Sequence, residues 1–195
     1  MKECERMKKR LVIFDCFGVI FGEVAPVFFK RHFPPEVAPV LKDKYFIPAD
    51  LGLVTYDELF DNMAKELNMN KDDILTEWNS IIHLNEEIIP VIKELRKNSD
   101  VILLSNAVES FVEGLFEKYS LNELFDRIFI SCYLKMAKPD PAIYQYAVSQ
   151  MNKEYDEIYM IDDNIKNVEN LHEIGIKGIQ YINITSLDEL LKGEN

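Results

Sequence analysis

The residues Leu11 to Phe14 form an unbroken apolar run that stops at Asp15, and Gly18 follows shortly after. A short apolar run that ends at a turn signal is typical of a strand buried on both faces, as in a parallel sheet. In open α/β sheets the ligand crevice lies outside the carboxyl ends of the strands, so we expect Asp15 to lie there. Asp15 taken alone could equally cap the following turn.

Strands and helices are expected to alternate after Pro90. The expected strands are Val101–Leu104, Ile128–Ile130, Ile158–Ile161 and Gly178–Ile182, and the expected helices are Val91–Lys97, Val108–Tyr119, Ala142–Met151, Ile165–Ile174 and a short one at Leu187–Leu191. With the first strand this makes five, and the alternation predicts an α/β protein with a Rossmann-like, doubly wound parallel sheet.

Residues 21–90 are predicted to be an inserted helical domain, with 1–20 and 91–195 forming the α/β core. Thr55 and Glu58 have the spacing of a capping box, and a second helix is expected to start at Asn70. Prolines are expected to break the earlier part of this segment into short pieces, at Pro34-Pro35, Pro39 and Pro48. Lys42, Lys44, Tyr45 and Asp50 are the insertion's candidates for substrate selection, although charged surface residues are usually only solvated.

The charge balance excludes some classes of partner. The chain has 195 residues, 22 of them basic and 34 acidic, which gives a net charge of −12 and argues against nucleic acid and anionic membranes. It does not exclude a small phosphorylated metabolite, because a local Lys and a divalent cation can outweigh the global charge. Nothing in the sequence indicates the oligomeric state.

Cysteine usage and hydropathy favour a soluble cytoplasmic protein. The 3 cysteines show no CxxC spacing, so a disulfide framework or zinc site is not expected. The basic start Met1–Arg10 is not read as a signal peptide because Asp15 interrupts the apolar stretch after it. No apolar run is long enough for a membrane span. Cys16 lacks a nearby His in the sequence and is not expected to be a nucleophile.

Polar residues follow three of the expected strands, and one lysine precedes a helix. They are Asp15, Ser105-Asn106, Lys138 and Asp162-Asp163. Because the carboxyl ends of parallel strands share one edge, these groups can converge, and they suit phosphoryl transfer by a carboxylate nucleophile with a cation, a lysine and a hydroxyl. Singly, Ser105-Asn106 could cap a helix and Lys138 could be a surface residue, but adjacent carboxylates repel and usually need a cation or donors.

The segments FDxxGV, LLSNA, KPDPAIY and IDDNIKNV occur in the order of the four motifs of the haloacid dehalogenase superfamily, which this chain resembles from Leu11 to about Ile182. The insertion after the first motif is similar to a subfamily I cap, most like variant 3 of subfamily IA. The resemblance implies that Asp15 is a nucleophile that forms an aspartyl-phosphate. It also implies that Ser105 and the Asn106 backbone bind the transferring group, and that Lys138 neutralises the charge shared by nucleophile and phosphate.

The resemblance further implies a Mg²⁺ site, which suits hard oxygen ligands. Asp15, Asp163 and the backbone carbonyl of Phe17 would bind the cation, while Asp162 would act directly or through a metal-bound water. Asn167 would brace the loop.

Phe17 departs from the family pattern, because phosphatases of this superfamily usually carry there a second Asp that protonates the leaving group. General acid assistance typically raises the rate by about 10²–10⁴-fold, so its loss should slow the hydrolysis of poor leaving groups without abolishing it. The favoured prediction is a Mg²⁺-dependent phosphatase of a small phosphometabolite, such as a sugar phosphate. The alternatives are a catalytically impaired phosphometabolite-binding or regulatory protein, a 2-haloacid dehalogenase and, less favoured, a transferase such as a mutase.

Overall fold

The computed structural model describes residues 9–192. Residues 1–8 of the basic start Met1–Arg10 lie outside the described residues, and so does Cys4, one of the 3 cysteines. Within the described range, no helix combines the length and the apolar character that crossing a membrane requires.

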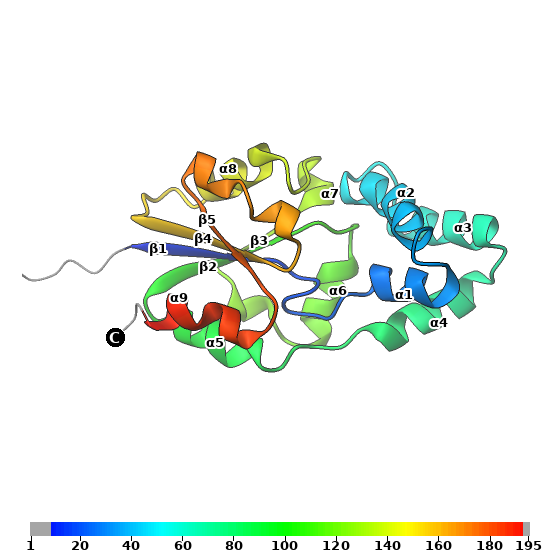
Figure 1. The fold of residues 1–195 in the computed structure, drawn as a ribbon, viewed down its shortest axis with the longest axis horizontal. Coiled ribbons are helices and arrows are strands. Elements are labelled where there is room, and N and C mark those ends of the chain that lie inside the picture. Colours follow the sequence, from blue (N-terminus) through cyan, green and yellow to red (C-terminus); the bar gives the residue numbers. More distant parts are fainter. Residues whose placement is uncertain (1–8, 193–195) are drawn as a thin grey trace, which may run out of the picture.

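Five parallel strands form one sheet with β1 (Arg10–Phe14) at its centre (Figure 1). The strand order is β3-β2-β1-β4-β5, where β2 is Ser99–Ser105, β3 is Arg127–Ile130, β4 is Glu157–Asp162 and β5 is Lys177–Gln180. The strands β2 and β3 follow on one side of β1, and β4 and β5 then follow on its other side. In such sheets the ligand crevice lies where the strand order switches, here between β1 and β4. The predicted fold class is confirmed.

The strand register brings the sequence-predicted polar residues to one edge. Phe14 lies opposite Leu103 of β2 and Ile161 of β4. The backbone N–H of Asp15 then donates to the carbonyl of Ile161 at 2.9 Å, so the chain is still held to the sheet where the apolar run ends. Asp15 consequently lies at the same level as the last residue of β4.

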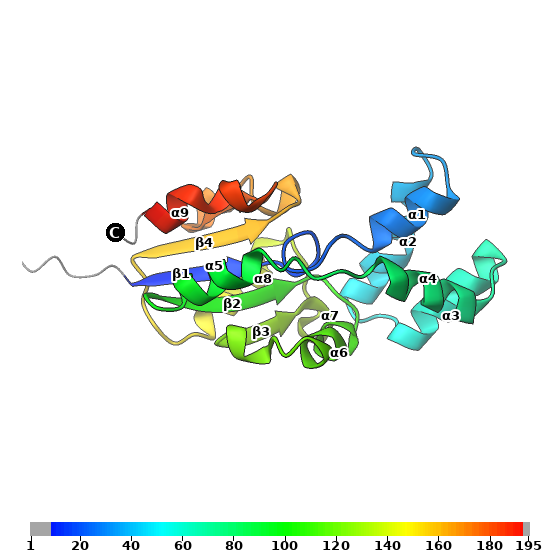
Figure 2. The same cartoon turned by 90° about the horizontal axis from the view of Figure 1, so that it is seen from below.

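Helices cover both faces of the sheet, which explains why β1 is apolar at consecutive positions (Figures 1 and 2). Val12 and Phe14 pack into the apolar cluster beneath α5 (Ile88–Leu95), α6 (Phe111–Lys118) and α9 (Asp188–Lys192). Leu11 and Ile13 point the other way, into a cluster with α8 (Pro141–Ser149). A short α7 (Ser131–Leu134) and the 3₁₀ turns Asn122–Leu124 and Ile184–Leu187 complete the connections.

Four further helices pack around their own apolar cluster, beyond the carboxyl ends of the strands (Figure 1). They are α1 (Ala25–His32), α2 (Ala38–Asp50), α3 (Tyr56–Leu67) and α4 (Lys71–Ile81), and we call them the helical cap. Trp78 is at the centre of this cluster, with ring centroids 5.3 Å from Phe60 and 5.4 Å from Phe46. Phe21, before α1, and Ile88, after α4, pack into the apolar cluster of the sheet instead. The two connections between cap and sheet therefore lie shortly before α1 and shortly after α4.

Two helix starts in the cap have the expected side-chain caps. The Thr55 hydroxyl accepts the N–H of Glu58, and the Glu58 carboxylate accepts the N–H of Thr55 at 2.8 Å, so the capping box is confirmed. The Asn70 side chain accepts the N–H of Asp72 at 2.8 Å and begins α4 as predicted.

Two local predictions are wrong. Pro48 does not break a helix but lies inside α2, within its last turn, where the carbonyl of Pro48 accepts the N–H of Leu53 beyond the helix end. The expected helix Ile165–Ile174 is instead two 3₁₀ turns, Ile165–Asn167 and Leu171–Ile174. The Asn164 side chain takes up the N–H of Lys166, and asparagine side chains that bond the backbone in this way compete with helical hydrogen bonds.

Replacing Thr55 by Ala should lower the free energy of unfolding by about 1 kcal/mol, because the first turn of α3 loses its side-chain acceptor. Thr55→Ser keeps that oxygen and serves as the control. Equal stability of the two variants in chemical denaturation would show that the capping box contributes nothing.

Candidate active site

The ends of β1 and β4 place three carboxylates together. Asp15 follows β1 directly, Asp162 is the last residue of β4, and Asp163 is next in the chain. Their carboxylate oxygens include a set that lies within 4.8 Å of one another. Asp162 is fully buried and Asp15 is nearly so. Three acidic groups in so small a space repel one another, so the site needs positive charge.

Lys138 provides part of that charge from the segment before α8. Its Nζ lies 2.7 Å from Oδ1 of Asp15 and 2.5 Å from Oδ2 of Asp162. The Asn106 side chain fixes the backbone of Lys138 from both sides, donating to its carbonyl and accepting its N–H, each at 2.8 Å. Burial lowers the pKa of Lys138, but the two carboxylates outweigh burial and raise the pKa above its ordinary value. Lys138 is therefore a permanent buried cation.

Asp162 is fully engaged by neighbouring donors. Besides Lys138, it accepts from the Asn167 side-chain amide at 3.0 Å and from the N–H of Asn164 at 2.9 Å. Asn167 is itself held by the hydroxyl of Tyr144, which donates to its backbone carbonyl at 2.9 Å. Asn167 thus braces the loop after β4, as the resemblance implies.

Asp15 and Asp163 are less well compensated. Burial is the main cause that raises the pKa of Asp15 well above its usual range, and the charge of Asp162 adds to it despite Lys138. The pKa of Asp163 is raised by burial and then by Asp162. Gly18 allows the turn after β1 to approach this group, since a Cβ there would lie 2.2 Å from Cγ of Asp163. The site thus has more carboxylates than ammonium groups, and carboxylate oxygens are the hard ligands that Mg²⁺ prefers.

The side chain of Phe17 cannot take part in proton transfer, because a phenyl ring neither donates nor accepts a proton. Its ring stacks on that of Phe111, with centroids 5.3 Å apart and planes 12° apart, and it also contacts Phe21. The ring thereby joins the turn after β1 to the start of α6. A phenyl ring, which cannot donate a proton, therefore occupies the position where phosphatases of the superfamily that the sequence resembles usually carry an Asp.

Ser105 and Asn106 differ in their access to the site. Asn106 lines the cavity described below, whereas Ser105 at the end of β2 is fully buried. The Ser105 hydroxyl contacts the Asn106 carbonyl at 3.5 Å and the thiol of Cys16. Burial and the neighbouring Asp15 raise the pKa of the Cys16 thiol, so this cysteine is a poor nucleophile.

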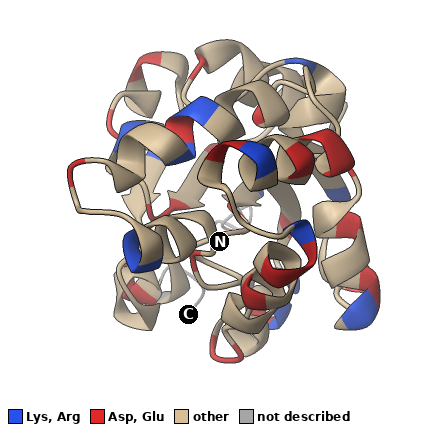
Figure 3. Ribbon diagram, turned by 90° about the vertical axis from the view of Figure 1, so that its right-hand side faces the viewer, with Lys and Arg blue, Asp and Glu red and all other residues tan. Residues whose placement is uncertain are grey.

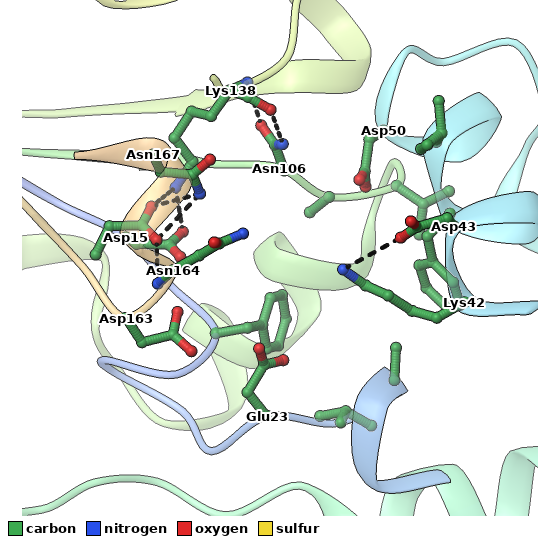
Figure 4. Close-up of a pocket in the computed structure, with 18 of the residues that line it drawn as sticks. Asp15, Glu23, Lys42, Asp43, Asp50, Asn106, Lys138, Asp163, Asn164 and Asn167 are labelled. Atoms are coloured by element: carbon green, nitrogen blue, oxygen red, sulfur yellow. Dashed lines mark hydrogen bonds and ion pairs between the residues drawn. The ribbon is translucent and has the colours of Figure 1, made fainter. Parts of the chain in front are cut away.

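A cavity of about 340 Å³ lies between these groups and the cap (Figure 4). Of the four cap candidates, Lys42 and Asp50 line it, and both point into it from α2. Lys44 instead pairs with Glu66 on an exposed surface, and Tyr45 is buried with its ring stacked on Phe29. The sequence prediction thus includes two residues that do not reach the cavity.

Sequence reasoning missed several residues that line the cavity. Glu23, between β1 and α1, hydrogen-bonds the carboxylate of Asp163, and its pKa is raised to about 7 by burial and by Asp163. Besides Phe17, the apolar part of the lining consists of Val24, Ala25, Phe46, Ile47, Trp78, Ala107, Val108, Phe111 and Pro139. The apolar pattern of the cap predicts only a packed core, and no signal in the sequence separates the cavity wall from that core.

Similarity to known proteins extends over most of the chain. The family model of haloacid dehalogenase-like hydrolases matches residues 9–175. A drimenol cyclase of Aspergillus calidoustus is 25% identical over 179 residues, which cover 88% of this chain and 34% of the cyclase, so the chain spans about a third of that relative's length. A sesquiterpene phosphatase of Aspergillus oryzae is 20% identical over 174 residues, covering 87% of this chain and 88% of the phosphatase.

The fold also matches solved structures. A HAD family enzyme from Bacteroides thetaiotaomicron, solved in complex with magnesium and inorganic phosphate, superposes with a TM-score of 0.70 at 22% identity, over 88% of this chain and 93% of that one. The likeness at this identity concerns the fold. The family model, which matches most of the chain, shows that this protein belongs to the haloacid dehalogenase-like hydrolases.

Proposed function

We propose that this hydrolase is a Mg²⁺-dependent phosphatase that acts on a small phosphorylated metabolite through an aspartyl-phosphate on Asp15. The observation that carries the proposal is the grouping of three carboxylates around the buried ammonium of Lys138 at one end of a single cavity. A carboxylate nucleophile beside a fixed cation suits attack on phosphorus, where charge must be neutralised as the groups approach.

In the proposed first step a carboxylate oxygen of Asp15 attacks phosphorus, and the bond from phosphorus to the organic oxygen breaks. Lys138 orients Asp15 through its 2.7 Å contact and places positive charge beside the phosphate. Water then attacks the aspartyl-phosphate, releasing inorganic phosphate and restoring the carboxylate. We assign the remaining phosphate contacts to the Ser105 hydroxyl and the backbone of Asn106, which requires the Ser105 hydroxyl to turn away from Cys16.

The Mg²⁺ ligands would be Asp15, Asp163 and the backbone carbonyl of Phe17. Asp162 already accepts from Lys138, Asn164 and Asn167, which favours contact through a metal-bound water. When bound, Mg²⁺ supplies charge neutralisation between the nucleophile and the phosphate. That the Bacteroides enzyme was solved with magnesium and inorganic phosphate supports Mg²⁺ as the cation.

The cavity wall favours a substrate whose organic group is largely apolar. Phe46 and Trp78 stack with planes 6° apart, and Phe111 and Ile47 add to the apolar lining of the cavity. A sugar phosphate, the example that the sequence analysis names, would leave most of this wall in contact with hydroxyl groups. The similarity to a sesquiterpene phosphatase supports an apolar group.

The alternatives fit the site less well. A 2-haloacid dehalogenase needs no metal, and the three adjacent carboxylates would then lack sufficient positive charge. A non-catalytic phosphometabolite-binding or regulatory protein is favoured only by Phe17.

Acidic residues mingle with basic ones at the cap end of the molecule (Figure 3), which supports a small metabolite over nucleic acid or an anionic membrane as the partner. We further propose a cytoplasmic location, which the cysteine usage favours.

Phosphate release should depend on Mg²⁺. We expect a panel of phosphomonoesters, including nitrophenyl, prenyl and sugar phosphates, to be hydrolysed with Mg²⁺ and not with EDTA, because the carboxylates otherwise repel the phosphate. The assay is inorganic phosphate release, with Mg²⁺ added back after EDTA as the control. Undiminished release in EDTA would refute the metal assignment.

Asp15→Asn should lower phosphate release at least about 10³-fold, the scale on which loss of a covalent nucleophile acts. Asp72→Asn, an exposed substitution on α4, is the control for the loss of one negative charge. Substantial activity of the Asp15 variant would exclude this residue as the nucleophile.

Ile47→Asp should raise KM for a prenyl phosphate at least ~10-fold and change KM for a sugar phosphate much less, because burying a charge against an apolar group is unfavourable. Ile47 is 55% exposed, so the fold should tolerate the change. Val40→Asp, on the same helix and 65% exposed, is the matched control. Equal effects of Ile47→Asp on both substrates would contradict an apolar organic group.

A further inference from the structure

The leaving group of the proposed reaction has no proton donor in the turn after β1. An organic oxygen that leaves phosphorus as an alkoxide needs a proton, and Phe17 occupies the position from which a carboxyl would give it. In an in-line displacement the leaving oxygen lies opposite the nucleophile. Since Asp15 attacks from the sheet edge, the leaving oxygen faces the cap.

Three carboxyl groups line the cavity on that side, and two of them are engaged elsewhere. Glu23 hydrogen-bonds Asp163 and so belongs to the side of the site where we place Mg²⁺. Asp43 is 61% exposed and lies 3.9 Å from the ammonium of Lys42. Asp50 points into the cavity, and among residues 9–192 its carboxyl group has no hydrogen-bond or ion-pair partner (Figure 4).

The position of Asp50 is fixed by contacts between the cap and the core. Asp50 is the last residue of α2, and the carbonyl of Gly52 just beyond it accepts from Nζ of Lys135 at 2.6 Å. The chain passes so close to the core here that a Cβ at Gly52 would lie 2.4 Å from the carbonyl oxygen of Cys132. The contacts of Gly52 therefore hold the end of α2 in place over the cavity, and the carboxyl group of Asp50 is not needed for this.

We propose that Asp50 is the general acid of this enzyme, donating its proton to the leaving-group oxygen that faces the cap. The inference rests on the proposed phosphatase function and adds a catalytic residue to it. As Asp15 bonds to phosphorus, the phosphorus–oxygen bond breaks, its electron pair stays on the organic oxygen, and the proton of Asp50 completes the alcohol. Water then attacks the aspartyl-phosphate, gives its proton to the Asp50 carboxylate, and the carboxylate of Asp15 leaves.

The protonation of Asp50 suits this role. Burial raises its pKa to about 7, against the opposing charges of Lys42 and Lys138, so a substantial fraction carries a proton near neutral pH. The charged groups around the cavity are Lys42 and Asp43 on α2, Glu23 before α1, Lys138 before α8, and Asp15, Asp162, Asp163 and Lys166 at the strand ends. Because the acid form is required, kcat/KM on a poor leaving group should fall as the pH rises through the pKa of Asp50.

The test compares two leaving groups in the purified full chain with Mg²⁺. Nitrophenyl phosphate needs no proton at its leaving oxygen, whereas hexyl phosphate does. We expect Asp50→Asn to lower kcat/KM on hexyl phosphate about 10²-fold, to change it less than about 3-fold on nitrophenyl phosphate, and to remove the alkaline fall with hexyl phosphate. Asp73→Asn, exposed on α4, is the charge control, and retained nitrophenyl activity reports that the variant is folded.

Equal losses on both substrates, or an alkaline fall that persists in the Asp50 variant, would overturn the assignment. Failure of the phosphatase proposal itself is distinguishable, because the unmodified protein would then release no phosphate from either substrate in an Asp15-dependent manner.

Discussion

The ammonium group of Lys138, buried between the carboxylates of Asp15 and Asp162, is the interaction on which the site depends. Removing three charges from water is costly, and it is tolerable here only because each charge has partners at hydrogen-bond distance. The surrounding structure supplies that geometry: Asn106 fixes the backbone of Lys138, and Asn167 and Asn164 complete the contacts of Asp162. The sheet register then places Asp15 at the same level.

This arrangement leaves an imbalance that defines the chemistry. One ammonium faces three carboxylates, and burial together with the charge of Asp162 raises the pKa of both Asp15 and Asp163. A divalent cation would remove that imbalance and lower both values. Without metal these carboxylates would repel a phosphate. With metal bound to them, the cation and Lys138 would place positive charge around the phosphate on the sheet side, and the organic group would face the cap.

The sequence was informative where local patterns reflect burial and strand ends. The apolar run of β1 required a sheet covered on both faces, and Asp15, Lys138 and Asp162 could be grouped because parallel strands end at one edge. The wall made by Phe46, Trp78 and Phe111 could not be predicted, because it depends on how the cap packs against the sheet edge.

Within the cap, the sequence could not tell which of Lys42, Lys44, Tyr45 and Asp50 face the cavity, since that depends on the rotation of α2 about its own axis. The turns of Ile165–Ile174 were likewise misjudged. Two 3₁₀ turns replace the expected helix because the Asn164 side chain accepts the N–H of Lys166, while the Asn167 side chain donates to Asp162.

The most direct test of the account is to locate the phosphoryl group during turnover. The protein would be mixed with nitrophenyl phosphate and Mg²⁺, quenched in acid within the first turnovers, digested, and its peptides analysed by mass spectrometry. The account predicts one added phosphoryl group on Asp15, in the peptide that contains Leu11 to Phe14, and its absence when EDTA replaces Mg²⁺. Steady phosphate release with the phosphoryl group on another residue, or on none, would contradict the central claim that Asp15 is the nucleophile.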